Sequence, residues 1–204
     1  RNCKLYVSEE RAAWRSPFET HVVSKRRMKE LSATETPQGI VALVPMLRAG
    51  TPQAGERAVY LHEIRDPGNL GTILRTLAWF GRFRCLLGPG SVDPYNPKVL
   101  RASVGAIFHT PIEVDIDLNA LRDRFPRIAC LDMHGTPLPS PQFHQFACYL
   151  FGNEAHGVPR EQLDAPGTMT FSIAGSNALE SRNVATSVSI CVYELSRACA
   201  HPRE

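Results

Sequence analysis

Asp66-Pro67-Gly68-Asn69-Leu70-Gly71-Thr72-Ile73-Leu74-Arg75-Thr76 is the most informative segment of this chain. A β-rich run over residues 59–64 leads into its Pro-Gly turn, and apolar residues at helical spacing follow. This pattern predicts a strand-to-helix junction that carries an Asn and an Arg. Because α/β proteins bind ligands at such junctions, Asn69 and Arg75 are candidate site residues.

The alternation of strand and helix continues along the chain from residue 58. We expect strands over 59–64, 84–88, 127–132, 147–152 and 169–173, and helices over about 70–81, 96–106, 118–125, 159–163 and 181–199. An alternation of this kind predicts an α/β fold, with a mostly parallel sheet covered by helices on both faces.

The first part of the chain has a different pattern. Residues 1–48 are expected to form a β-α-β unit, with a strand over 3–7, a helix from Ser8 and an extended segment over 39–44. Such a segment is too short to bury a strong core alone, and the chain starts with Arg1 rather than Met. We therefore interpret it as the back half of a small domain, with a further N-terminal piece expected before it. Residues 49–57 are small, polar and contain Gly and Pro, which predicts a linker.

Composition excludes several classes of protein. The chain has 204 residues, of which 43% are hydrophobic and 21% charged, and no apolar run approaches the roughly 20 residues of a membrane span. Six scattered cysteines without a Cys-x-x-Cys pair and seven histidines without zinc spacing argue against a disulfide scaffold and against a metal site. A reduced, cytoplasmic protein is the expectation. Gly88-Pro89-Gly90 is not a dinucleotide fingerprint, because position 93 is Asp rather than Gly.

The distribution of charge is more informative than its sum. A net charge of +3 does not identify a partner, but basic residues gather in clusters that would attract an anionic polymer. The candidates for contact with a nucleic acid are Lys25, Arg26, Arg27, Arg65 and Arg75. The alternative interpretation is a set of solvated helix faces.

Two later segments fall at junctions that correspond to the first. Phe151-Gly152-Asn153-Glu154-Ala155-His156-Gly157 follows an apolar strand, and Glu180-Ser181-Arg182-Asn183-Val184-Ala185 opens the last helix. Gly152 would let a ligand approach the backbone. Glu154 could equally be a carboxylate at a helix N-terminus, and Ser181 and Asn183 could be helix caps.

Taken together, the three segments resemble the SpoU family of RNA ribose 2′-O-methyltransferases, within the SPOUT superfamily. The likeness covers about residues 58–197 in the family's order and includes a helix over 98–106. Residues 21–44 resemble the end of the ribosomal-protein-like RNA-binding domain that often precedes the catalytic one. The resemblance implies a C-terminal trefoil knot, S-adenosylmethionine bound in that knot, a homodimer, and three parts of the chain: a partial RNA-binding domain (1–48), a linker (49–57) and a catalytic domain (58–204).

The resemblance also assigns roles to residues. It implies a catalytic set of Asn69, Arg75, Glu154, Ser181 and Asn183, and a cofactor-binding set of Gly152, Asn153, Ile173 and Arg182. Two positions depart from the family pattern, because Arg182 replaces the usual Leu and Ala174 replaces the usual Pro. Arg holds its proton up to a pKa of about 12 or more, so we expect Arg75 to stabilise the developing alkoxide rather than to act as a base.

The expected function is methylation of a ribose 2′-hydroxyl in structured RNA, ribosomal rather than transfer RNA. A transfer RNA methyltransferase is the first alternative. A knotted RNA-binding module without catalysis is the second, and Arg182 is the residue that favours it. A flavodoxin-like nucleotide-binding protein is disfavoured by the Asn-to-Arg segment and by the polar loop before the last helix.

Overall fold

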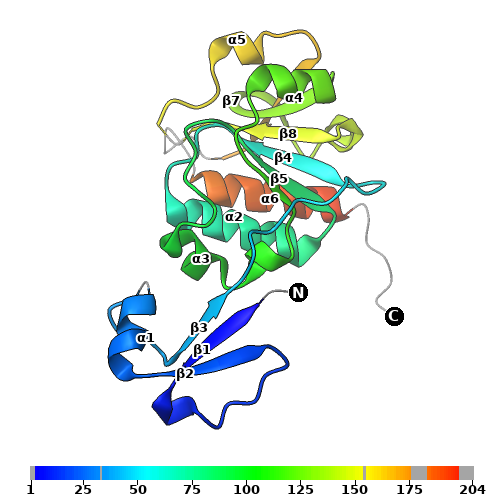
Figure 1. The fold of residues 1–204 in the computed structure, drawn as a ribbon. Coiled ribbons are helices and arrows are strands. Elements are labelled where there is room, and N and C mark those ends of the chain that lie inside the picture. The colour runs from blue at the N-terminus through cyan, green and yellow to red at the C-terminus, as the bar shows by residue number, and fades with distance from the viewer. Residues whose placement is uncertain (1–2, 33, 154, 176–182, 198–204) are drawn as a thin grey trace. The chain divides into compact units, whose positions relative to one another are not determined.

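The computed structural model describes residues 3–32, 34–153, 155–175 and 183–197. The chain divides into two compact units, residues 1–47 and residues 48–204, which are drawn in Figure 1.

The smaller unit is a three-stranded sheet with one helix. Its elements are β1 (Lys4–Ser8), the 3₁₀ helix η1 (Glu9–Arg11), β2 (Glu19–Val23), α1 (Lys25–Leu31) and β3 (Ile40–Leu43). The strand order is β2-β1-β3, with β1 parallel to β2 and antiparallel to β3. Val7 of β1 and Met28 of α1 are buried and form the core of this unit.

The prediction of a helix from Ser8 is wrong. Only the three residues of η1 are helical there, and β2 follows where no strand was expected. Pro17 limits how far a helix could extend here, because proline disfavours helical backbone in the residue before it, although η1 already ends at Arg11. The β-branched Thr20, Val22 and Val23 then favour an extended chain.

The larger unit alternates strands and helices. Its elements are β4 (Arg57–Leu61), α2 (Pro67–Phe80), β5 (Phe83–Leu87), α3 (Pro97–Ser103), η2 (Ala106–Phe108), β6 (Ile112–Glu113), α4 (Leu118–Arg124), β7 (Ile128–Leu138), η3 (Pro141–Gln145), β8 (Cys148–Phe151), α5 (Arg160–Leu163), β9 (Thr168–Ile173) and α6 (Val184–Arg197).

Six strands of the larger unit form one sheet in the order β6-β5-β4-β8-β7-β9. Every neighbouring pair in this sheet is parallel. The prediction of an α/β fold with a mostly parallel sheet is therefore confirmed. Because all the strands run in one direction, their carboxyl ends share one edge, which is where ligands bind in such sheets.

Helices cover both faces of the sheet, as expected. α2, α3 and α6 lie on one face and α4 and α5 on the other (Figure 1). The side chains of each strand alternate between the two cores: Val59 and Leu61 of β4 face α2 and α6, whereas Ala58 and Tyr60 face α4. This alternation explains why the strands read as continuous apolar runs rather than as an apolar-polar alternation.

Several element boundaries differ from the expectation. The helix expected over 96–106 ends at Ser103, because Val104 and Gly105 adopt left-handed backbone angles that close it. β6 is only two residues long and was not predicted. β7 extends to Leu138, six residues beyond its expected end, through an irregular register with β9. The helix expected over 181–199 is seen as α6, and its two predicted ends lie outside the described residues.

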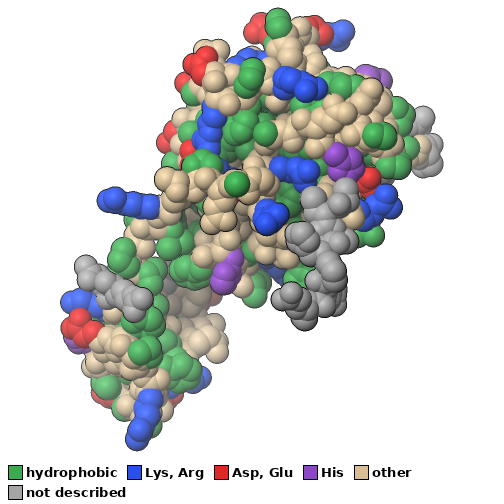
Figure 2. All heavy atoms as spheres, turned by 90° about the vertical axis from the view of Figure 1, so that its right-hand side faces the viewer, with side chains coloured by type: hydrophobic (Ala, Val, Ile, Leu, Met, Phe, Trp, Pro, Cys, Tyr) green, Lys and Arg blue, Asp and Glu red, His purple; other side chains and the backbone are tan. Residues whose placement is uncertain are grey.

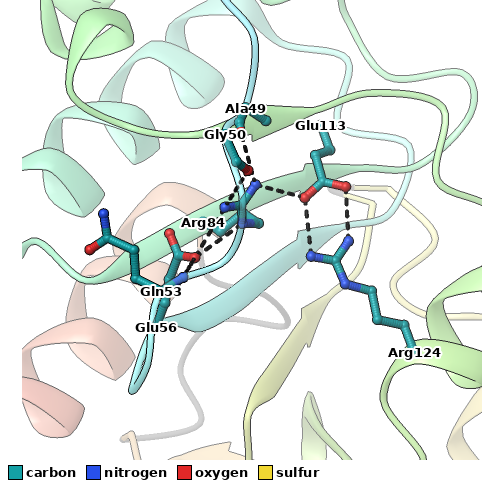
Figure 3. Close-up of polar contacts among 7 residues, drawn as sticks. All are labelled: Ala49, Gly50, Gln53, Glu56, Arg84, Glu113 and Arg124. Carbon is teal, nitrogen blue, oxygen red and sulfur yellow. Dashed lines mark hydrogen bonds and ion pairs between the residues drawn. The ribbon is translucent and has the colours of Figure 1, made fainter.

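A buried arginine fastens the segment before β4 to the sheet. Arg84, at the start of β5, is only 3% exposed. Its guanidinium donates to the carbonyls of Ala49 and Gly50, and it pairs with Glu56 at 3.1 Å and with Glu113 at 2.9 Å (Figure 3). Residues 49–56 of the predicted linker therefore hold the N-terminal edge of the sheet, and β4 already begins at Arg57.

Candidate functional site

Two of the three sequence segments meet at the ends of α2 and α6. The side-chain Nδ2 of Asn183 donates to Oδ1 of Asn69 at 2.9 Å. Seven residues further along α2 and six further along α6, the hydroxyls of Thr76 and Ser189 lie 3.0 Å apart. The two helices thus run side by side through polar contacts, and the paired asparagines lie at the end of α2 that follows β4.

Helix capping fixes both asparagines in place. Asp66 caps α2, because its carboxylate accepts from the backbone N–H of Asn69 at 2.6 Å. Asn183 precedes the first residue of α6, and its Oδ1 accepts from the N–H of Thr186 at 3.2 Å. The capping interpretation of Asn183 is therefore correct, and its amide nitrogen is nevertheless used to bind Asn69. One side chain serves both purposes because an amide has separate donor and acceptor ends.

Arg75 lies on a different face of α2 from Asn69. The two residues are six positions apart, which places them about 120° apart around the helix at 3.6 residues per turn. Asn69 and Thr76 face α6, whereas Arg75 is exposed together with Thr72 and Trp79. Within one chain the structure brings Asn69 and Asn183 together and leaves Arg75 on the neighbouring solvent-facing side.

Asn153 organises the loop that follows β8. Its side chain is buried; Nδ2 donates to the carbonyl of Glu63 at 2.8 Å, and Oδ1 accepts from the N–H groups of Ala155 and His156. Backbone bonds between Asn153 and Gly157 close the same loop. Asn153 therefore joins the carboxyl ends of β4 and β8. Because its side-chain amide is used in these bonds, a ligand at this loop would be bound by backbone groups.

Gly152 follows the last residue of β8, and Ile173 is the last residue of β9; these two strands flank β7. A Cβ on Gly152 would collide with the backbone of Gly157 and Val158, so glycine is required there by the fold of the chain itself. Both residues are half-buried at the carboxyl edge. The remaining predicted residues of this group, Glu154, Ser181 and Arg182, lie outside the described residues.

Sequence reasoning missed polar groups at the ends of β4 and β5. His62 Nδ1 and Ser91 Oγ are buried, and within the described part of the chain neither atom has a hydrogen-bond partner. The two loops are joined by a bond from the N–H of Val92 to the carbonyl of Ile64 at 2.7 Å. Glu63, next to His62, adopts a positive φ of 48°, which is uncommon for a residue with a side chain. No sequence pattern marks these residues, because a single His or Ser has no characteristic spacing.

The predicted nucleic-acid contacts are distributed over both units. Lys25, Arg26 and Arg27 lie on α1 of the smaller unit, where Arg26 and Arg27 both pair with Glu30. Hydrogen bonds from the side chain of Arg27 and, to a smaller extent, from that of Arg26 lower the pKa of Glu30. In the larger unit, Arg65 pairs with Glu63 at 2.8 Å. Among these candidates, Lys25 and Arg75 are exposed and form no ion pair within the described residues.

The buried titratable groups are unsuited to nucleophilic or acid–base chemistry. Burial raises the pKa of the Cys85, Cys130 and Cys148 thiols to about 12, and burial followed by the charge of Asp117 raises the pKa of Tyr60 to about 12. A thiol with such a pKa is not ionised near neutral pH and is a poor nucleophile. Across the described ranges, no group of three or more His, Cys, Asp or Glu side chains is placed to hold a metal ion.

The geometry is that of a site for binding and positioning. Amide side chains, loop backbone and one exposed guanidinium are available at or beside the carboxyl edge. These groups can hold a ribose, an adenosine or a phosphate by hydrogen bonds. No helix within the described residues is both long and apolar enough to cross a membrane.

Most of the chain is similar in sequence to known RNA methyltransferases. Residues 56–193 match the model of the SpoU rRNA Methylase family. The 23S rRNA (guanosine(2553)-2′-O)-methyltransferase RlmP of Bacillus subtilis is 32% identical over 185 residues, which covers 87% of this chain and 73% of that protein.

Two solved structures share the fold. A protein from Porphyromonas gingivalis that is assigned to the TrmH family of RNA methyltransferases superposes with a TM-score of 0.78 at 28% identity and covers 97% of this chain and 83% of its own. The SpoU methyltransferase AviRb of Streptomyces viridochromogenes, solved with S-adenosylmethionine, superposes with a TM-score of 0.79 at 20% identity, over 96% of this chain and 82% of its own. These likenesses and the strand order identify the fold as the SPOUT type. The predicted threading of the C-terminal segment involves residues 176–182, which lie outside the described part of the chain.

Proposed function

This chain belongs to the SpoU rRNA methylase family, and on that premise we propose that it transfers a methyl group from S-adenosylmethionine to a ribose 2′-hydroxyl in structured RNA. The observation that carries the proposal is the contact between Asn69 and Asn183, because it brings the first and last sequence segments together beside the loop of the second. Ribosomal RNA is the favoured substrate, since the relative from Bacillus subtilis is named for it. Transfer RNA is the alternative.

The carboxyl edge of the sheet fits S-adenosylmethionine. Gly152 and Ile173 present backbone at the ends of the two strands on either side of β7, and Asn153 holds the loop after β8 against the end of β4. We assign binding to this backbone, with Arg182 as the fourth predicted contact. Bound there, S-adenosylmethionine supplies a methyl group on a positively charged sulfur, which an oxygen nucleophile can attack.

The residues of the chain contribute by positioning. In the transfer, a bond forms between the ribose 2′-oxygen and the methyl carbon, the sulfur–methyl bond breaks, and the hydroxyl proton leaves to solvent or to a nearby base. We assign Asn69, Ser181 and Asn183 to orienting the ribose, and Glu154 to balancing the sulfonium charge. Arg75 binds the adjacent phosphate and stabilises the developing alkoxide through its planar fork. Positioning of this kind can supply roughly 7–11 kcal/mol of the rate enhancement.

A second copy of the chain completes the site in this proposal. Arg75 and the Asn69–Asn183 pair face different sides of α2, so one chain does not direct both at one ligand. Trp79 and Tyr193 are 83% and 56% exposed on α2 and α6, and Tyr193 stacks edge-on with Phe80. Exposed aromatic side chains of this size are typical of subunit interfaces. We assign these two helices to the homodimer interface.

We assign RNA binding to the smaller unit. Residues 1–47 hold eight Lys and Arg against five Asp and Glu, whereas residues 48–204 hold fifteen of each. The net charge of +3 therefore belongs to the smaller unit, as suits contact with a polyanion. The free cysteines of the described residues suit a reducing cytoplasm, where we place the protein.

Calorimetry with S-adenosylmethionine tests the cofactor part of this proposal. We expect saturable binding that weakens when Asn153 is replaced by Ala. Absence of binding at millimolar cofactor would leave the RNA-binding module without catalysis as the better account. Mapping of 2′-O-methylation in ribosomal and transfer RNA from cells that lack the protein then distinguishes the two substrates, because only the true substrate loses a modification.

A further inference from the structure

The charges of the larger unit are strongly segregated. Between Asp66 and Glu113 the chain has a single acidic residue, Asp93, against five basic ones: Arg75, Arg82, Arg84, Lys98 and Arg101. Since the unit as a whole holds equal numbers of both signs, the rest of it is correspondingly acidic. Figure 2 shows one face of the larger unit, on which most acidic side chains lie toward the top, the end at which Figure 1 places α4 and α5, while basic side chains lie both there and lower down.

The fold places part of the basic segment along one pair of helices. α2 and α3 pack so closely that a Cβ at position 71 would collide with Ala102. Further along the chain, the hydroxyl of Thr110 donates to the carbonyl of Leu74 in α2 at 3.3 Å. Arg75 follows Gly71 by one turn and lies on the α3 side of the exposed face of α2. Lys98 and Arg101 of α3 are also exposed, and they share one face because they are three residues apart.

The acidic groups around these helices are already engaged. Asp66 caps α2, Asp93 accepts from the N–H of Tyr95 at 2.8 Å, and Glu63 pairs with Arg65. Glu113 and Glu56 neutralise the buried Arg84. Within the described residues, Arg75, Lys98 and Arg101 take part in no ion pair, so their charges are available to a partner.

A solvated helix face is the simpler interpretation of Lys98 and Arg101, and the exposed apolar side chains on the same stretch of chain argue against it. Leu100, Val104 and Phe108 are 40%, 74% and 58% exposed on the same short segment. A face that only contacts water does not need three large apolar groups. Cations next to an exposed aromatic ring are typical of surfaces that bind single-stranded RNA, since phosphates contact the charges and bases stack on the ring.

We propose that α3 is a second RNA contact, in which Lys98 and Arg101 bind phosphates of the strand whose target nucleotide is held at Arg75. This inference rests on the proposed function, because it takes RNA as the substrate. It adds a phosphate-binding track beside the methylation site that does not read sequence.

The salt dependence of RNA binding tests the track. The double variant Lys98→Gln with Arg101→Gln keeps most of each aliphatic stem and removes both charges, and the probe is a fluorescein-labelled 20-nucleotide oligouridine. Loss of two phosphate contacts should reduce the slope of log K against log salt by about 1.4, because each contact to a single strand contributes about 0.7. Affinity at 50 mM salt should fall by about 10- to 100-fold.

Arg160→Gln is the matched control, since Arg160 is an exposed cation of α5 on the opposite face of the sheet. An unchanged slope in the double variant, or an equal change in the control, would overturn the proposal. Calorimetry with S-adenosylmethionine on the same samples separates the two levels of inference. If the double variant binds the cofactor normally and its slope of log K against log salt is unchanged, only the phosphate-binding track is contradicted. If the wild-type protein binds no cofactor, the proposed function is contradicted.

Discussion

The side-chain amide of Asn183 donates a hydrogen bond to the side-chain oxygen of Asn69 over 2.9 Å, and this bond joins positions 114 residues apart in the chain. Neither asparagine is held only by the other. Asn69 lies in the first turn of α2, which Asp66 caps, and Asn183 caps α6. The contact is therefore between two preorganised groups, which is the condition for precise positioning of a ligand.

Asn69→Leu should uncouple the two segments, because leucine has a similar size and no acceptor. We expect a loss of about 1 kcal/mol of unfolding free energy, the usual net value of a hydrogen bond, and a fall of about 100-fold in kcat, the cost of a small misplacement. Asn69→Asp keeps an acceptor for Asn183 and should retain most of the stability. Denaturant unfolding and single-turnover methyl transfer measure the two effects, and equal stability of both variants would contradict a working bond.

Arg75→Lys tests whether a planar fork is required. Lysine keeps the positive charge and loses bidentate binding of phosphate. We expect kcat to fall at least 100-fold in Arg75→Lys and further in Arg75→Ala, while the affinity for S-adenosylmethionine measured by calorimetry stays unchanged. Appreciable turnover in Arg75→Lys would show that charge alone is sufficient and that the fork has no special role.

The sequence predicted the sheet well because both of its faces are covered. Strands buried on both sides appear as continuous apolar runs, and the helices between them have clear apolar periodicity, as in α2. The helix expected from Ser8 was wrong because only Glu9–Arg11 are helical and the strand β2 begins soon afterwards at Glu19. β6 escaped prediction since two residues carry no periodicity.

For the candidate site, the sequence motifs indicated the correct segments but not how their side chains are used. Asn153 was expected to bind cofactor, and its amide is occupied in holding two loops together. Arg75 and Asn183 were expected in one catalytic set, and the phase of α2 places Arg75 on a different face of that helix from Asn69, the partner of Asn183. Such details depend on helix phase and on contacts between distant loops, which no local pattern encodes.

Asn153→Asp separates the two functions of this amide. The carboxylate keeps the acceptor for the N–H groups of Ala155 and His156, and it removes the donor to the carbonyl of Glu63. We expect a loss of about 1–3 kcal/mol of unfolding free energy, the cost of an unsatisfied buried group, and a weaker affinity for S-adenosylmethionine. Asn153→Ala should lose more on both counts. Unchanged cofactor affinity in Asn153→Ala would exclude this loop from the binding site.

Arg84→Met should destabilise the larger unit by about 3–5 kcal/mol, because the carboxylate of Glu56 would be left buried without its counter-charge and would keep only the N–H of Gln53. A double variant that also carries Glu56→Gln should recover part of this loss. Thermal and denaturant unfolding measure both. If Arg84→Met unfolds at the wild-type midpoint, the network in Figure 3 contributes nothing to stability.

Glu113 gives the same network a pH dependence. Burial opposes its ionisation, but hydrogen bonds and charges from Arg124 and Arg84 outweigh burial and lower the pKa of Glu113. A carboxylate with a lowered folded pKa stabilises the protein fully above its unfolded pKa of about 4.3, and this stabilisation is lost as the pH falls through the folded pKa. Glu113→Gln should therefore be less stable than wild type at pH 7, and the difference should shrink below about pH 4. A constant difference across this range would contradict the assignment.

Identification of the methylated nucleoside decides whether this protein methylates a ribose 2′-hydroxyl. Purified protein is incubated with S-adenosylmethionine labelled in its methyl group and with transcripts of ribosomal RNA, and the RNA is digested to nucleosides that are separated by mass. We predict label in a 2′-O-methylribonucleoside, and little label in reactions with the Arg75→Ala variant. Label in a base-methylated nucleoside, or none from a protein that binds both cofactor and RNA, would contradict it.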